Sequence, residues 1–60
     1  MKELALYLMS LGFVRIQRDI LSIITWHSEE EVVKRLPNEY EICDRWKQQN
    51  NSMQYDIRIK

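Results

Sequence analysis

The chain has 60 residues, of which 45% are hydrophobic and 30% are charged, a composition typical of a folded globular domain and not of a disordered tail. Lys plus Arg and Asp plus Glu number 9 each, so no overall field draws the chain to nucleic acid or to an acidic membrane. A chain of 60 residues predicts one domain, residues 1–60, with a core so small that association with another chain is a natural source of stability.

The first predicted element is an amphipathic helix over residues 2–11. Gly12 stands where a C-terminal cap belongs, because glycine adopts the left-handed conformation that ends many helices. The apolar stretch around this helix is too short and too interrupted to span a bilayer, and no signal-peptide cleavage pattern follows it. The apolar positions of the helix follow the spacing of one helical face: Leu4, Tyr7, Leu8 and Leu11.

Two strands are predicted next, over residues 13–17 and 20–26. Phe13, Val14 and Ile16 alternate with polar residues, and the segment that follows is rich in β-branched residues. The turn between the strands would fall at Arg18 and Asp19, which lack the Gly or Asn that usually marks a tight hairpin turn. One long bent strand over the same residues is therefore the alternative.

A second helix is predicted to begin at Ser28. Ser28 followed by Glu31 has the spacing of a capping box, and three consecutive glutamates place negative charge at the positive end of the helix dipole. Side chains at consecutive helix positions point in different directions, so these glutamates do not predict a cation site. Pro37 ends the helix, and its short apolar side consists of Val32, Val33 and Leu36.

The last third of the chain predicts a β-hairpin. Apolar and polar residues alternate in both of its arms, which gives two strands with one apolar face each. The polar segment 48–52 between the arms has the length of a hairpin loop. The residues predicted to face inward are Tyr40, Ile42, Trp46, Met53, Tyr55, Ile57 and Ile59.

These elements predict an α+β fold with the order αββαββ. A two-layer sandwich satisfies them, with both short helices on one face of an antiparallel sheet of three or four strands. The two halves of the chain, divided near Ser28, then repeat the same succession of elements. Trp26 and Trp46 are expected to pack under the helices, and an exposed tryptophan would instead be an anchor for a binding partner.

No constellation of residues in the sequence predicts catalysis. Cys43 is the only cysteine and His27 the only histidine, and no third group is recognisable that would support a thiolate and imidazole pair. The same two residues leave a zinc site two ligands short, and a single cysteine cannot form an intrachain disulfide. We therefore expect a cytoplasmic protein that is not an enzyme and that uses no metal, no cofactor and no small-molecule substrate.

The candidate binding surface lies on the outward face of the predicted sheet. If the basic strands are neighbours, they form a patch that binds phosphate groups, with exposed aromatic rings stacking on bases. Glu41 and Asp56 are interleaved with this patch and would neutralise part of it. Together with Trp46 as an interface anchor, the candidate partner-binding residues are Arg15, Arg45, Lys47, Arg58 and Lys60.

The hypothesis that fits these features best is a small stand-alone protein-binding domain, an inhibitor or adaptor of a larger macromolecular partner. A small core and exposed sheet edges favour a protein partner or self-association as a homo-oligomer, and no membrane partner is expected. The length and the lack of a catalytic set suit a product of a phage or another mobile element. The alternative is a small nucleic-acid-binding protein that uses the basic sheet face.

Overall fold

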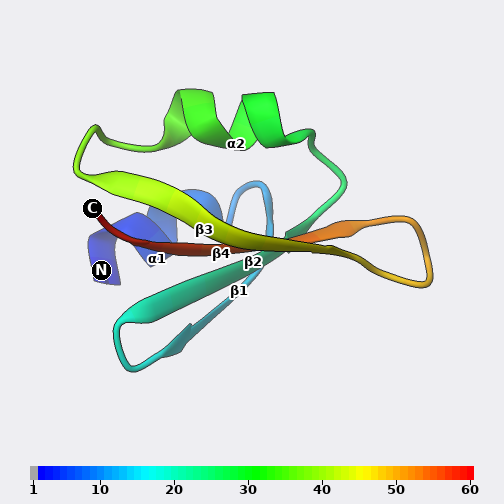
Figure 1. Ribbon diagram of the computed structural model, residues 1–60, viewed down its shortest axis with the longest axis horizontal. Coiled ribbons are helices and arrows are strands. Elements are labelled where there is room, and N and C mark those ends of the chain that lie inside the picture. The colour runs from blue at the N-terminus through cyan, green and yellow to red at the C-terminus, as the bar shows by residue number, and fades with distance from the viewer. Residues whose placement is uncertain (1) are drawn as a thin grey trace.

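The computed structural model describes residues 2–60, which form two helices and one four-stranded antiparallel sheet (Figure 1). The order αββαββ predicted from the sequence is confirmed. In this part of the chain, no helix is both long and apolar enough to cross a membrane. The elements are α1 (Lys2–Leu8), β1 (Gly12–Gln17), β2 (Ile20–Thr25), α2 (Glu29–Arg35), β3 (Tyr40–Lys47) and β4 (Met53–Ile59).

Helix α1 is shorter than the sequence predicts. It ends at Leu8, so Leu11 lies in the turn that follows the helix. The prediction that Gly12 caps this helix is wrong, because Gly12 is the first residue of β1 and its φ is not positive. A β-carbon on Gly12 would collide with the backbone carbonyl of Ile24 in the neighbouring strand. Glycine is therefore needed here for the close approach of two strands and not for a left-handed turn.

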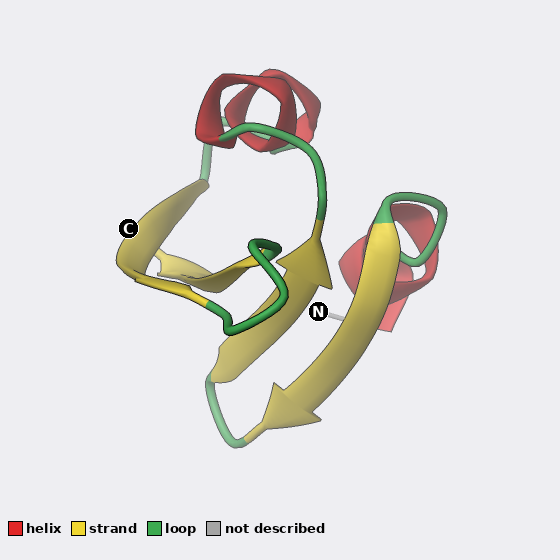
Figure 2. Cartoon of the chain, turned by 90° about the vertical axis from the view of Figure 1, so that its right-hand side faces the viewer, coloured by secondary structure: helices red, strands yellow, loops and turns green. Residues whose placement is uncertain are grey.

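Strands β1 and β2 form a hairpin, which confirms two strands in place of one bent strand (Figure 2). Gln17 lies opposite Ile20, so the loop consists of Arg18 and Asp19 alone. Arg18 has a φ of 55°, a left-handed conformation that glycine adopts without strain and arginine does not. The pairing of the flanking strands imposes this conformation, which explains why the turn is barely visible in the sequence.

Helix α2 begins at the predicted cap. The Oγ of Ser28 accepts a hydrogen bond from the backbone N–H of Glu31, with a donor–acceptor distance of 3.3 Å. The carboxylate of Glu31 contacts Arg35 Nη1 at 3.0 Å and Lys34 Nζ at 3.9 Å. The hydrogen bond from Arg35 and the charge of Lys34 lower the pKa of Glu31 below its ordinary 4.5. These ion pairs connect the acidic first turn of α2 with its basic last turn.

The sheet has the strand order β1-β2-β4-β3, and every neighbouring pair is antiparallel. The second strand of each half of the chain is therefore central, and the first strand of each half is an edge. The β3–β4 hairpin closes through the predicted loop 48–52 and projects away from both helices (Figure 1). In this loop Asn50 Oδ1 accepts hydrogen bonds from the N–H of Ser52 at 3.1 Å and from its Oγ at 2.6 Å.

Strand β3 contains a β-bulge at Cys43. Ile42 lies opposite Ile57 and Asp44 lies opposite Asp56, so one extra residue stands between these two pairs. Because side chains alternate between the two faces of a strand, the extra residue shifts the alternation by one position. The residues after the bulge that exchange their predicted faces are Arg45, Trp46 and Lys47.

One hydrophobic core lies between the helices and one face of the sheet. Leu21 lies opposite Ile57 and Ile23 lies opposite Tyr55, so the two central strands present these residues on the same side. Because residues of both helices join this cluster, both helices cover that face and leave the other face uncovered. The core consists of Leu4, Ala5 and Leu8 of α1, Val32 of α2, Leu21 and Ile23 of β2, and Tyr55 and Ile57 of β4.

Tyr55 provides a test of this core at high pH. Its side chain is 2% exposed, and burial together with the charge of Glu29 raises the pKa of its hydroxyl above 10.0. The unfolded chain therefore releases this proton at a lower pH than the folded chain, and the free energy of unfolding decreases as the pH rises above 10.0.

We expect the Tyr55→Phe variant to lose less stability than the unsubstituted chain between about pH 9 and about pH 11, because phenylalanine has no proton to release. Urea unfolding followed by circular dichroism at both pH values measures this difference. Equal losses for the two chains would mean that Tyr55 ionises as easily in the folded as in the unfolded state.

Candidate functional site

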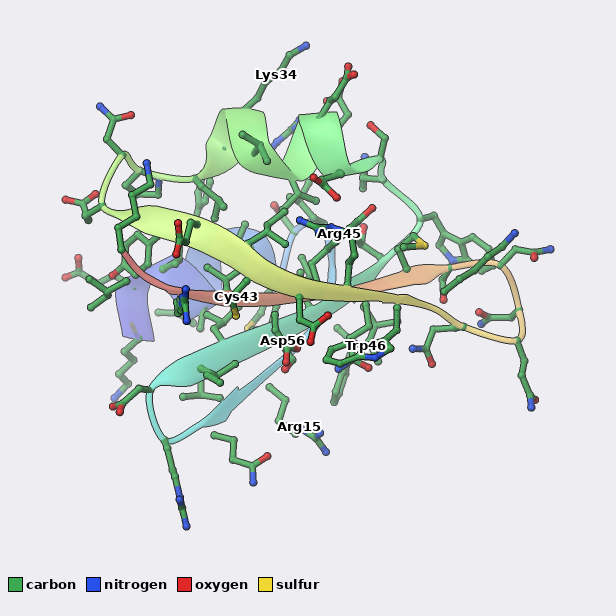
Figure 3. The ribbon with its side chains drawn as sticks, viewed as in Figure 1. Arg15, Lys34, Cys43, Arg45, Trp46 and Asp56 are labelled. Carbon is green, nitrogen blue, oxygen red and sulfur yellow. The ribbon has the colours of Figure 1, made fainter. Side chains whose placement is uncertain are left out.

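The uncovered side of the sheet, here called the open face, collects side chains from all four strands. Figure 3 shows Arg15, Asp56 and Trp46 on the side of the ribbon away from α2, whereas Arg45 extends toward α2. By their register, the residues of the open face are Phe13, Arg15 and Gln17 of β1, Ile20, Ser22 and Ile24 of β2, Gln54, Asp56 and Arg58 of β4, and Glu41, Asp44 and Trp46 of β3.

A largely apolar row crosses the open face. Phe13 lies opposite Ile24, Ile24 lies opposite Gln54, and Gln54 lies opposite Trp46. Phe13 and Trp46 stand at the two ends of the row, because β1 and β3 are the edge strands. Phe13 is 66% exposed and Trp46 is 45% exposed. Exposed aromatic side chains on an uncovered sheet face are typical of surfaces that become buried in a complex.

A network of polar side chains beside this row holds Asp56 in place. Its Oδ1 accepts hydrogen bonds from Ser22 Oγ at 2.7 Å and from Gln54 Nε2 at 3.3 Å. The Oε1 of Gln54 accepts in turn from Gln48 Nε2 at 3.3 Å. Because these side chains already bond to one another, the centre of the open face is ordered before any partner binds.

The charge of the open face is mixed, and carboxylates outnumber basic groups. Glu41 Oε2 accepts a hydrogen bond from Arg58 Nε at 3.0 Å. Asp44 lies directly opposite Asp56, which places two negative charges on neighbouring strands. Arg15 is, among residues 2–60, the basic side chain of this face that makes no ion pair.

The single basic patch predicted from the sequence is not formed. Strands β1 and β3 lie at opposite edges of the sheet, so Arg15 and Arg45 are not neighbours. The bulge turns Arg45 and Lys47 to the helix side, where Arg45 Nε donates to Oε1 of Glu29 in α2 at 2.6 Å. Lys60 follows the end of β4, so only Arg15 and Arg58 of the predicted basic residues lie on the open face.

Both tryptophans are exposed, contrary to the expectation that they pack under the helices. Trp46 reaches the open face because the bulge reverses the alternation in β3. Trp26 is 71% exposed because it follows Thr25, the last residue of β2, and lies outside the paired strands. Thr25 itself ends the strand by donating to the carbonyl oxygen of Leu11 at 2.8 Å and accepting from the N–H of His27 at 3.1 Å.

Cys43 and His27 lie in different parts of the fold, Cys43 at the bulge of β3 and His27 beyond the end of β2. The Sγ of Cys43 donates to the carbonyl oxygen of Asp56 at 3.4 Å, and the side chain of His27 is exposed beyond the end of β2. Within residues 2–60, no three His, Cys, Asp or Glu side chains are grouped to hold a metal ion. A shallow groove between α1 and the start of β3, lined in part by Tyr7 and Arg35, is open to solvent and carries charges of both signs.

Comparisons with protein-family models, with curated proteins and with solved structures gave no match to this chain.

Proposed function

We propose that this domain binds another protein through the open face and acts as an inhibitor or adaptor of that partner. The observation that carries the proposal is the row in which Phe13, Ile24 and Trp46 stand exposed or half-exposed across an uncovered sheet. Aromatic side chains are enriched in protein interfaces because they bury a large apolar area with little loss of conformational freedom.

The arrangement of the open face supports a protein partner in a second way. The polar groups in and beside the row are bonded to one another, as for Ser22, Gln54 and Asp56, so covering them leaves few unpaired donors or acceptors. An apolar row beside a satisfied polar network is the combination found in the buried centre and the rim of many interfaces.

Nucleic-acid binding has less support as an alternative. A sheet that binds nucleic acid combines exposed rings with a basic surface that neutralises phosphates. Phe13 and Trp46 supply the rings, but Glu41, Asp44 and Asp56 lie among them and repel a phosphate backbone.

The test of the proposal is Trp46→Ser, with Trp26→Ser as a control of the same residue type. We expect Trp46→Ser to weaken binding by about 2 kcal/mol or more, roughly thirty-fold in the dissociation constant, which is the size of effect typical of an interface tryptophan. Trp26 is more exposed but lies outside the paired strands, so Trp26→Ser should leave binding within about two-fold.

The measurement is affinity capture from the native host, followed by titration of the captured protein with each purified variant. Equal binding by both variants would contradict a site on the open face, and loss of binding with Trp26→Ser alone would place the site at the β2–α2 connection. Salt-dependent binding of single-stranded DNA or RNA that is lost on Arg15→Glu would favour the nucleic-acid alternative.

A further inference from the structure

The two edges of the sheet differ in how they are protected against pairing with another strand. Strand β3 carries the bulge at Cys43, and the Oδ1 of Asp44 accepts a hydrogen bond from the backbone N–H of Arg45 at 2.8 Å. Charged side chains also line most of its second half. Bulges and charges are the usual means by which proteins block an edge strand.

Strand β1 has none of these protections except one charge. Its register with β2 is continuous, it contains no proline, and Arg15 is its single charged residue. Phe13 is 66% exposed and Ile16 is 45% exposed. Of the two edges formed by residues 2–60, β1 is therefore the one suited to accept another strand.

The hairpin geometry determines which backbone groups of β1 are free. A two-residue loop requires that Gln17 and Ile20 exchange hydrogen bonds. Every second residue of β1, counted back from Gln17, therefore points its N–H and C=O groups toward β2. The N–H and C=O groups that point away from β2 are those of Gly12, Val14 and Ile16.

We propose that a second copy of this chain pairs with β1 in antiparallel orientation, with the two-fold axis at Val14. In this register Val14 pairs with Val14 of the second copy, Gly12 with Ile16, and Phe13 with Arg15. Every outward-facing amide and carbonyl of β1 then has a partner, and the two sheets become one continuous sheet.

The sequence of β1 is self-complementary in this register. Each Phe13 ring lies beside an Arg15 guanidinium of the other copy on the open face, an arrangement that favours a cation–π contact. On the helix side the exposed Ile16 lies over Gly12, which has no side chain to obstruct it. Moving the axis by one residue to Arg15 would place two arginines directly opposite each other and leave fewer amides paired.

This pairing goes beyond the proposed function, because it uses a strand edge and a second copy, whereas the proposed function uses the open face and a different protein. Phe13 belongs to both surfaces, so Trp46 is the residue whose substitution distinguishes them. An edge-to-edge contact buries less area than a standard interface, so the dimer is expected to be weak, with a dissociation constant in the micromolar range. It also joins two open faces into one larger surface with an interface at its centre.

A register-specific cross-link tests the proposal in a Cys43→Ser background, where the native thiol is absent. Two single variants, Phe13→Cys and a tagged Arg15→Cys, are oxidised separately and as a mixture. Directly opposite residues in such a pair have the spacing of a disulfide, whereas the diagonal pair Phe13 and Phe13 is too far apart. We expect the mixed disulfide to exceed either homodimeric disulfide at least ten-fold.

Sedimentation of the unsubstituted chain over the micromolar range gives the second readout, with a rise from 7.4 kDa toward a dimer expected. Val14→Pro removes an outward N–H without removing a bond to β2, and should keep the chain monomeric while circular dichroism confirms that it is folded. If this variant fails to fold, the yield of the mixed disulfide alone tests whether the two β1 strands pair.

Three results would overturn the proposal: a monomer throughout the concentration range, equal yields of all three disulfides, or a dimer that Trp46→Ser dissociates. None of these readouts requires the protein partner of the proposed function. A failure of partner binding with an intact mixed disulfide, or the reverse, therefore separates the two proposals.

Discussion

Ile57→Ala is expected to lower the free energy of unfolding by about 2–5 kcal/mol, the usual effect of truncating a fully buried isoleucine. Ile57 is 0% exposed and lies in central strand β4, within the cluster that contains residues of both helices. A small domain of this kind has only about 3–5 kcal/mol of stability from its core, so a large fraction of the variant should be unfolded at room temperature.

The matched control for this prediction is Ile59→Ala, which changes the same residue type in the same strand and on the same face. Ile59 is 59% exposed, so its truncation should change the free energy of unfolding by less than about 1 kcal/mol. Urea unfolding followed by circular dichroism is the suitable measurement, because both tryptophans are exposed in the folded chain and report burial poorly. Equal effects of the two substitutions would mean that the core is assigned to the wrong positions.

The second large effect is expected for Gly12→Ala, which should lower the free energy of unfolding by about 1–3 kcal/mol. The added β-carbon would collide with the carbonyl group of Ile24, and this obstacle is backbone in a central strand that cannot rotate aside. Relief of the collision would separate β1 from β2 at one end of the hairpin, where Gly12 lies opposite Thr25.

Gln17→Ala is the control for this substitution, since Gln17 is exposed at the other end of the same strand. We expect it to change the free energy of unfolding by no more than about 0.5 kcal/mol. Full stability of the Gly12→Ala chain in the same urea titration would show that the strands do not approach closely at this point.

The elements that the sequence predicts well are those in which a local signal and the final packing agree. Ser28 caps α2 as its spacing to Glu31 predicts, and the alternation from Met53 to Ile57 becomes a strand with one buried face. Only at the end of that strand does the prediction fail, because Ile59, predicted to face inward, is 59% exposed. In these segments the residues that favour the local structure are also those that enter the core, so reasoning along the chain is sufficient.

The candidate site could be predicted only in part, because a bulge is a property of two paired strands. Nothing in the run Ile42, Cys43, Asp44 marks the extra residue, yet its presence exchanges the faces of Arg45 and Trp46. Strict alternation therefore predicts Arg45 on the open face and Trp46 in the core, the reverse of their positions in the structure.

Two other differences arise from residues whose sequence signal has more than one physical cause. Gly12 follows an apolar helix pattern and so suggests a helix cap, but the strand pairing that needs it lies thirteen residues further on, at Thr25. Arg18 adopts a left-handed conformation that its residue type disfavours, because the strands on either side determine the turn. Such tertiary requirements cannot be deduced from neighbouring residues.

Because β2 and β4 lie side by side in the centre of the sheet, neither half of the chain can complete a core alone. Residues 2–27 would carry Leu21 and Ile23 on a strand that is paired on one side only, and residues 28–60 would carry Tyr55 and Ile57 in the same situation. Folding is therefore expected to be all-or-none, because each half of the chain becomes stable only when the other half packs against it. The short connection between them acts chiefly as a tether that maintains a high effective concentration of each half for the other.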